Sequence, residues 1–288
     1  MAAVHGVLFG LLAMFGYGLS NALAKIPSQA IGSKKTILYR NIFVSAILLV
    51  ALLVFLKESV FNLNYILITL AISLIGYIPV VSFYKALSLG KLGVISPIAN
   101  SSVLFTVLFS FLFFKEKLSL IQLLAILVIT AGIVFSSLNF KEFKSSRLFK
   151  ISSGVPFALI SCFLWGLVFT LFKIPVNVLG PVLTSFVLEF GMIFYSTFHL
   201  KLSRVSFKAP PKRIMAYLFG VALFAAMGTL CFNLGITKAQ VSLVAAFTFA
   251  NPLVAVLYGK LVYKEKLKKQ QWLAIGLILA GIVSLAYF

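Results

Sequence analysis

The chain has 288 residues, of which 62% are hydrophobic and only 10% are charged, and its formal net charge is +20. A soluble domain needs about 25% charged residues to cover its surface, so this composition excludes a soluble fold and indicates an integral membrane protein. The Lys and Arg residues lie mainly between apolar segments, where anionic lipid headgroups are the nearest partners. We therefore expect no nucleic-acid binding.

Ten apolar segments of membrane length follow one another along the chain. About 20 apolar residues cross the hydrocarbon core of a bilayer, and we predict helices at 2–24, 36–56, 63–84, 93–114, 118–138, 153–172, 180–200, 214–234, 241–262 and 270–288. Continuous apolar runs such as 46–56 contradict the alternating pattern of a membrane β-barrel. The predicted fold class is therefore an all-α integral membrane protein with ten transmembrane helices.

The second half of the sequence repeats the first at an offset of 148 to 149 residues. Three short segments recur: GVLF at 6–9 as GVPF at 154–157, KIP at 25–27 as KIP at 173–175, and KEKL at 115–118 as KEKL at 264–267. Five spans carry the chain to the opposite side of the bilayer, so the second copy must be inverted. We predict two inverted five-helix repeats, 1–140 and 150–288, an arrangement typical of alternating-access transporters.

The basic residues are shared unequally between the two sides of the predicted bundle. Most of them lie in the connections that follow the first, third, fifth, seventh and ninth spans. The positive-inside rule places these connections in the cytoplasm, and it therefore predicts that both termini lie outside.

Several motifs recur in both halves. The opening helices carry Tyr17-Gly18 and Trp165-Gly166, and the last helices begin near Glu116 and Glu265 and continue with Gln-x-x-Ala-x-x-x-x-x-Ala-Gly. The ninth span contains Asn251-Pro252. Over the whole chain this order of motifs resembles the drug/metabolite transporter superfamily, specifically its ten-helix EamA-type members. The resemblance implies export of amino acids and related metabolites, and it implies cytoplasmic termini, the reverse of the orientation that the loop charges predict.

Two residues of opposite charge lie inside predicted spans, Arg40 in the second and Glu189 in the seventh, and the offset of 149 makes them equivalent positions. A charge at the bilayer centre costs about 2.5 to 3.5 kcal/mol, so each should face a wet cavity or a partner. In one interpretation Arg40 holds a substrate carboxylate or phosphate, and Glu189 accepts an amino group or a coupling proton. In the other, the two form a buried ion pair that joins their helices.

Other polar, aromatic and helix-breaking residues are candidates to line a central cavity. The substrate-binding candidates are Tyr17, Asn21, Tyr77, Tyr84, Asn100, Trp165, Asn233 and Asn251, with Ser20, Ser96, Thr170, Thr229 and Thr248 as further polar candidates. An interhelical hydrogen bond is the alternative interpretation for each. A proline frees a carbonyl one turn earlier, so Pro79, Pro97 and Pro252 predict helix breaks and pore-facing third, fourth and ninth helices. Because Val103 stands where the second half has Pro252, Pro97 is expected to shift the break in the first half.

The sequence contains no residue combination typical of an active site or a metal centre. It has two His and no Asp, no Gly-rich phosphate loop opens a helix, and Cys162 and Cys231 lie in apolar spans without paired or metal-ligand spacing. His199 is near a helix end, where an interfacial position is expected. We therefore expect no catalytic residue, no metal and no cofactor, and we assign the cysteines to packing.

The predicted function is secondary transport of a small organic metabolite, amino acids or related compounds, by alternating access around a midplane cavity. We expect an exporter in the plasma membrane, a monomer or weak homodimer, driven by a proton or substrate gradient. Multidrug or cationic-compound efflux is the alternative if Glu189 acts alone, and a sugar-phosphate or nucleotide-sugar carrier if Arg40 does. A lipid flippase component or a structural membrane subunit is an alternative of another class, since fold alone does not fix function.

Overall fold

The computed structural model describes residues 2–90, 92–137, 153–262, 264, 267 and 269–287, which form helices and connections without any strand. The first repeat contains α1 (Ala2–Ile31), α2 (Ser33–Val54), the 3-10 helix η1 (Leu56–Glu58), α3 (Leu63–Leu89), α4 (Leu92–Asn100), α5 (Val103–Phe114) and α6 (Leu120–Ser137). The second contains α8 (Val155–Leu171), α9 (Lys173–Leu179), α10 (Pro181–Leu202), α11 (Lys212–Ile236), α12 (Val241–Phe249), α13 (Pro252–Val262) and α14 (Lys269–Tyr287).

Ten spans result when consecutive helices separated by a short break are taken together, as in α4 with α5, α8 with α9, and α12 with α13. Within the described ranges, nine spans are long and apolar enough to cross a bilayer, and α6 adds a shorter apolar helix at Leu120–Ser136. The predicted fold of ten membrane helices in two five-helix repeats is confirmed. Helix α1 extends beyond its predicted end to Ile31, because Pro27 lies inside the helix without ending it.

The fourth and ninth spans are broken at equivalent places. Helix α4 ends at Asn100 and α5 begins at Val103, while α12 ends at Phe249 and α13 begins at Pro252. The offset of 149 brings both pairs of ends into register. The two repeats therefore share one backbone design, with a broken helix as the fourth span of each.

In the fourth span, proline does not decide where the helix breaks. Pro97 lies inside α4, so the expectation that it shifts the break of the first half is wrong. The chain leaves the helix only at Ser101 and Ser102, where the bonds tighten to a spacing of three residues, as from the Ser102 N–H to the Ala99 carbonyl at 3.4 Å. Pro79 lies within the continuous helix α3, and its prediction as a helix break is wrong as well.

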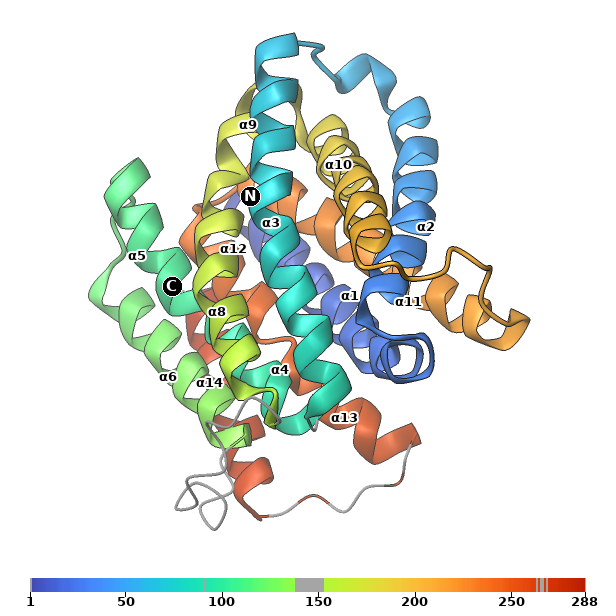
Figure 1. Cartoon of the computed structure of the whole chain (residues 1–288). Helices are drawn as coiled ribbons and strands as arrows, with labels where there is room; N and C mark the ends of the chain where they lie inside the picture. Colours follow the sequence, from blue (N-terminus) through green and yellow to red (C-terminus); the bar gives the residue numbers. More distant parts are fainter. Residues whose placement is uncertain are drawn as a thin grey trace.

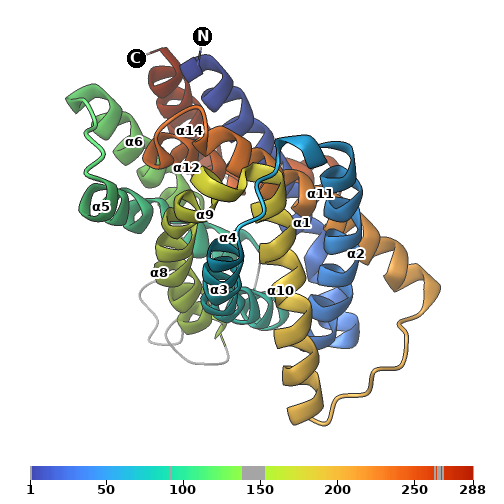
Figure 2. The same ribbon diagram turned by 90° about the horizontal axis from the view of Figure 1, so that it is seen from above.

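The main helix interfaces join one repeat to the other. Helix α1 packs against α11 and α12, α8 against α3 and α4, α2 against α10, and α6 against α14 (Figure 1). Each of these contacts is matched by a contact between the repeat-related helices, as an inverted repeat requires. Figure 2 shows that α1 begins and α14 ends at the same end of the molecule, as expected for an even number of crossings.

The α6–α14 interface shows the symmetry at the level of single atoms. A Cβ added to Gly132 would lie 2.9 Å from the Ala274 carbonyl oxygen, and one added to Gly281 would lie 2.9 Å from the Ala125 carbonyl oxygen. Only glycine permits so close a crossing of two helices. These alanines and glycines are members of the repeated Gln-x-x-Ala-x-x-x-x-x-Ala-Gly pattern, which therefore encodes this interface.

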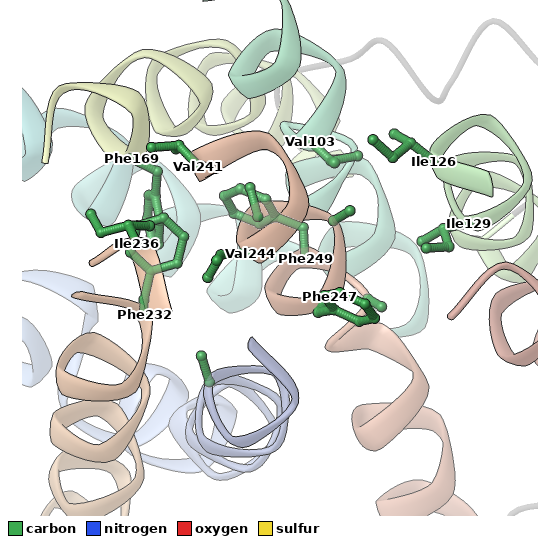
Figure 3. Packing of buried hydrophobic residues seen from close by; sticks show 14 of the residues in the cluster. Val103, Ile126, Ile129, Phe169, Phe232, Ile236, Val241, Val244, Phe247 and Phe249 are labelled. Atoms are coloured by element: carbon green, nitrogen blue, oxygen red, sulfur yellow. The ribbon is translucent and has the colours of Figure 1, made fainter. Parts of the chain in front are cut away.

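Helix α12 lies in the centre of the bundle. In the ninth span, 78% of the most apolar stretch is buried, the largest share among the described spans. Figure 3 shows Val241, Val244, Phe247 and Phe249 of α12 among side chains of neighbouring helices, which are Val103, Ile126, Ile129, Phe169, Phe232 and Ile236. This packing holds the end of α12, and the break that follows it, against α1, α5 and α8.

Candidate functional site

A cavity lies between the two repeats and is lined by residues of both. Its wall comes from α1, α2, α3, α4, α8, α10, α11 and the end of α12. The polar and amphipathic lining residues are Tyr17, Ser20, Asn21, Arg40, Tyr84, Asn100, Trp165, Glu189, Thr229 and Asn251. The apolar lining residues are Gly76, Val80, Phe83, Val168, Phe169, Phe172, Leu188, Met192 and Phe249.

Arg40 of α2 and Glu189 of α10 form a bidentate ion pair in the cavity wall. The Nη1 group of Arg40 donates to Oε2 of Glu189, and Nη2 donates to Oε1 at 3.1 Å. Both side chains are buried, with 8% and 6% of their surface exposed. The planar fork of the guanidinium matches the two carboxylate oxygens, so each buried charge balances the other. The Nε group of Arg40 has no hydrogen-bond partner in the described ranges and remains an unused donor.

Two further helices hold Glu189 in place. Thr229 of α11 donates its hydroxyl to Oε1 of Glu189 at 3.0 Å, and Tyr17 of α1 donates its hydroxyl to Thr229 Oγ1 at 3.0 Å. Together with the ion pair, these bonds connect α1 and α2 of the first repeat to α10 and α11 of the second. A movement of one repeat against the other must therefore change this network.

A chain of three asparagines joins the two broken spans to α1. The Nδ2 group of Asn251 donates to Oδ1 of Asn100 at 2.5 Å, and Nδ2 of Asn21 donates to Oδ1 of Asn251 at 3.3 Å. The carboxamides also bond the backbone near the breaks, since Asn100 donates to the Ser96 carbonyl at 2.7 Å and Asn251 to the Thr248 carbonyl at 3.1 Å. Side chains thus add hydrogen bonds to carbonyls next to the breaks, where the regular helical bonding is interrupted inside a membrane.

The repeated aromatic-Gly pairs pack directly on these breaks. In Tyr17-Gly18, a Cβ on the glycine would lie 2.9 Å from the Asn251 carbonyl oxygen, and in Trp165-Gly166 it would lie 3.0 Å from the Ser102 carbonyl oxygen. Glycine is required because the opening helix approaches the backbone of the broken helix so closely. The aromatic neighbour in each pair lines the cavity. The motif therefore brings one cavity residue and one broken span together in each repeat.

Aromatic side chains form much of the remaining wall. The sequence predicts Tyr84 and Trp165 there, but it does not single out four phenylalanines, which are Phe83, Phe169, Phe172 and Phe249. Phe83 packs on Trp165 with ring centroids 4.9 Å apart, and Phe169 packs on Phe249 at 4.9 Å. The chain has 30 Phe residues, most of them in core or lipid positions, so residue type alone carries no signal for a cavity.

Two predicted binding residues lie outside the cavity wall. The Tyr77 hydroxyl lies 2.9 Å from Nδ1 of His199, which joins α3 to α10, and Nδ2 of Asn233 donates to the Ser185 hydroxyl at 2.8 Å, which joins α11 to α10. Their polar groups thus make interhelical hydrogen bonds, the alternative that the sequence left open. Among the further polar candidates, Ser20 and Thr229 line the cavity, whereas Ser96, Thr170 and Thr248 do not.

The three prolines do not line the cavity, although the spans that contain them do. Pro252, a predicted helix break, begins α13 directly after the break, while the carbonyl of Pro79 accepts a hydrogen bond from the Ser161 hydroxyl at 2.9 Å. Proline thus identifies the pore-facing helices without identifying pore-facing residues.

Some sequence predictions fall on residues that the structure does not describe. Among these are Glu265, which is the repeat partner of Glu116, and the predicted repeat boundaries at 140 and 150. The described ranges contain no group of three or more His, Cys, Asp or Glu residues that could hold a metal ion. Cys162 and Cys231 are buried free thiols.

Comparisons with known proteins agree with this architecture. A model of the EamA-like transporter family matches the chain twice, at residues 4–138 and 152–287. An uncharacterized protein of Methanocaldococcus jannaschii is 29% identical over 140 residues, which are 46% of this chain and 96% of that protein, so that protein is about one repeat long. A protein crystal structure superposes with a TM-score of 0.77 at 18% identity, covering 97% of this chain and 95% of the other, and it shares the fold.

Proposed function

Because the chain belongs to the EamA-like transporter family, we propose that it is a secondary exporter of amino acids or closely related metabolites in the plasma membrane. The protein is a multi-pass membrane transporter with two repeats. In the proposed cycle the repeats rock about the central cavity, which opens to one side of the membrane and then to the other.

The Arg40–Glu189 pair in the cavity wall is the observation that carries the proposed substrate class. A zwitterion supplies one carboxylate and one ammonium group, so it can replace the internal pair with two new pairs of the same kind. The unused Nε donor of Arg40 gives the incoming carboxylate an additional partner. A substrate with a single charge would leave either Arg40 or Glu189 buried without a counter-charge, which is costly.

The rest of the cavity supports a substrate that also carries an apolar or aromatic group. Rings of Phe83, Tyr84, Trp165 and Phe249 offer surface for such a group, and aromatic pairs add to plain burial of area. The asparagine chain of Asn21, Asn100 and Asn251 supplies polar contacts next to these rings. An amino acid with a large side chain combines all three requirements.

We further propose that a proton drives the cycle through Glu189. It is the one carboxylate among the residues that line the cavity. In the part of the cycle in which Arg40 has left Glu189 and no substrate ammonium has taken its place, a proton on Glu189 avoids a buried charge without a partner. Substrate and proton are then linked through one side chain.

Transport by purified protein in proteoliposomes tests the substrate class. Separate vesicles are loaded with a labelled amino acid mixture, a lipophilic cation, a hexose phosphate or a labelled phospholipid, each with and without a pH gradient. The proposal predicts that the amino acids move and that the gradient accelerates them. Movement of only the cation or only the sugar phosphate would assign the alternative transport functions, phospholipid movement would assign a flippase, and no movement of any probe would contradict transport.

A further inference from the structure

A second carboxylate is buried outside the cavity, at the end of the molecule where α1 begins and α14 ends. Glu116 lies between α5 and α6 and is only 7% exposed. Its Oε1 accepts from the Val241 N–H at 2.9 Å and from Lys173 Nζ at 2.8 Å, and its Oε2 accepts from the Ser242 N–H at 3.0 Å and from the Ser242 hydroxyl. A residue of the first repeat therefore collects donors from two helices of the second.

Glu116 caps a helix that is not its own. Val241 and Ser242 open α12, where the first N–H groups have no intrahelical partner and the positive end of the helix dipole favours a carboxylate. Burial by itself raises the pKa of Glu116, but the hydrogen bonds from Lys173, Ser242 and Val241 outweigh burial and lower the pKa below its ordinary value. The carboxylate is therefore charged at neutral pH and keeps all of these contacts.

These contacts lie on two helices of the second repeat that border the cavity at their other residues. Lys173 opens α9, and the residue before it, Phe172, lines the cavity. Helix α12, which Glu116 caps, ends at Phe249, which also lines the cavity. A further bond from Nε2 of Gln240 to the Lys117 carbonyl at 3.2 Å runs alongside. The connection between α5 and α6 thus holds two second-repeat helices that lead to residues of the cavity wall.

We propose that Glu116, Lys173, Val241 and Ser242 form a latch that closes the cavity at this end and that opens once in each transport cycle. While the latch is formed, α5 and α6 cannot move away from α9 and α12, so solute cannot pass between them. To open, the carboxylate must give up its donors together, which favours the closed arrangement in the absence of substrate. The latch requires alternating access but does not depend on the identity of the substrate.

Cysteine labelling in detergent tests the latch, because the reagent then reaches both ends of the molecule and no substrate is needed. The background is Cys162→Ala with Cys231→Ala. Phe172→Cys reports on the latch end. Val80→Cys reports on the other end. Gly76 of α3 lies against Val168 of α8, and these two helices run in opposite directions. Val80, one turn after Gly76, and Phe172, one turn after Val168, therefore lie on opposite sides of that contact.

We expect Glu116→Gln to raise the rate of maleimide labelling at Phe172→Cys by about tenfold, since the amide cannot accept from all of the charged and backbone donors. Labelling at Val80→Cys should stay within about twofold, the scatter expected for a distant site. An unchanged rate at Phe172→Cys would overturn the proposal, and so would equal increases at both reporters, which would indicate general loosening.

A milder variant keeps the test decisive if Glu116→Gln does not fold. Ser242→Ala removes one hydroxyl and keeps both backbone donors, and it should raise labelling at Phe172→Cys by about threefold. A wild-type rate in a folded Ser242→Ala variant would contradict the latch. Because labelling needs no substrate, failure of amino acid transport would refute the proposed substrate class and leave the latch standing.

Discussion

Two buried carboxylates form ion pairs between the repeats, and their surroundings differ. Glu189 faces the cavity and is balanced by side chains alone, the guanidinium of Arg40 and the hydroxyl of Thr229. Glu116 lies at one end of the molecule, where two of its donors are backbone N–H groups of α12 and its cation, Lys173, is 23% exposed.

The difference separates a pair that a ligand can replace from one that only a movement of helices can break. A zwitterion in the cavity offers Glu189 and Arg40 the same charges that they offer each other. Nothing in the cavity offers Glu116 a substitute for the N-terminus of α12. The first pair therefore suits substrate exchange, and the second suits a latch whose opening depends on the relative position of the repeats.

The largest expected effect comes from breaking the cavity pair on one side. Arg40→Met leaves Glu189 buried without a counter-charge and should reduce the free energy of unfolding by about 3 to 5 kcal/mol. The measurement is denaturant unfolding in mixed micelles. A variant as stable as the wild type would show that Glu189 does not depend on Arg40.

The double variant Arg40→Met with Glu189→Leu sharpens this result. Both charges are removed, so most of the lost stability should return, to within about 1 kcal/mol of the wild type. Amino acid transport should remain absent, because the cavity then contains neither charge. A double variant that transports amino acids normally would assign the pair to stability alone.

The latch should give a smaller loss of stability. Glu116→Gln removes the charge that faces the N-terminus of α12 and Lys173, and it should reduce the free energy of unfolding by about 2 kcal/mol. Lys57→Gln, which removes a charge at an exposed position of η1, is the control and should change stability by less than about 0.5 kcal/mol. Equal losses in the two variants would contradict a specific role for Glu116.

The pH dependence of that loss follows from the lowered pKa of Glu116. A carboxyl with a lowered pKa in the folded state stabilises the fold above its unfolded value of 4.5, and this contribution disappears as the pH falls through the lower folded value. The stability difference between wild type and Glu116→Gln should therefore be constant from about pH 7 to pH 5 and shrink in more acidic solution. A difference that vanished at neutral pH would contradict the assigned charge.

Hydroxyl deletions compare the two pairs at the level of single hydrogen bonds. Thr229→Val and Ser242→Ala each remove one donor to a buried carboxylate, and each should cost about 1.5 kcal/mol of stability. Their functional effects should differ, since Thr229→Val acts on transport and Ser242→Ala on labelling of the latch end. Identical effects of both variants in both assays would remove the distinction between the pairs.

The smallest expected change in the free energy of unfolding comes from a single hydrogen bond of a lysine. Lys34 donates to the Ser203 hydroxyl at 2.6 Å where the start of α2 meets the end of α10, and the bond is partly buried. Water replaces such a contact readily, so Lys34→Gln should alter the free energy of unfolding by less than about 0.5 kcal/mol. A larger loss would mean that this end of the molecule depends on the contact.

The sequence predicts the fold well because each prediction rests on the membrane and on the repeat. The length of the apolar segments locates the ten spans. The offset of 149 makes Arg40 and Glu189 equivalent positions in the sequence, and the structure places them in contact. The same offset explains why Gly132 and Gly281 recur, since each admits the other repeat's helix. What proline predicts is less reliable, because Pro79 and Pro97 both lie inside helices that continue past them.

Much of the cavity cannot be predicted from residue type. Phe83 and Phe169 line it, but they have the same chemistry as the many Phe residues in the core and on the lipid side. Asn233 and Tyr77 are predicted cavity residues because they are polar, yet each one forms a hydrogen bond to a neighbouring helix. The motif around Glu116 is visible in the sequence, whereas its partners on α9 and α12 follow only from the packing of the two repeats.

The most direct test is gradient-driven transport of labelled amino acids in proteoliposomes by the wild type, Glu189→Gln and the control Lys57→Gln. We predict that the wild type and Lys57→Gln move amino acids faster when a pH gradient is imposed, and that Glu189→Gln loses the response to the gradient. Equal gradient-driven transport by Glu189→Gln would show that the cavity pair does not couple substrate to protons, and it would contradict the proposed mechanism.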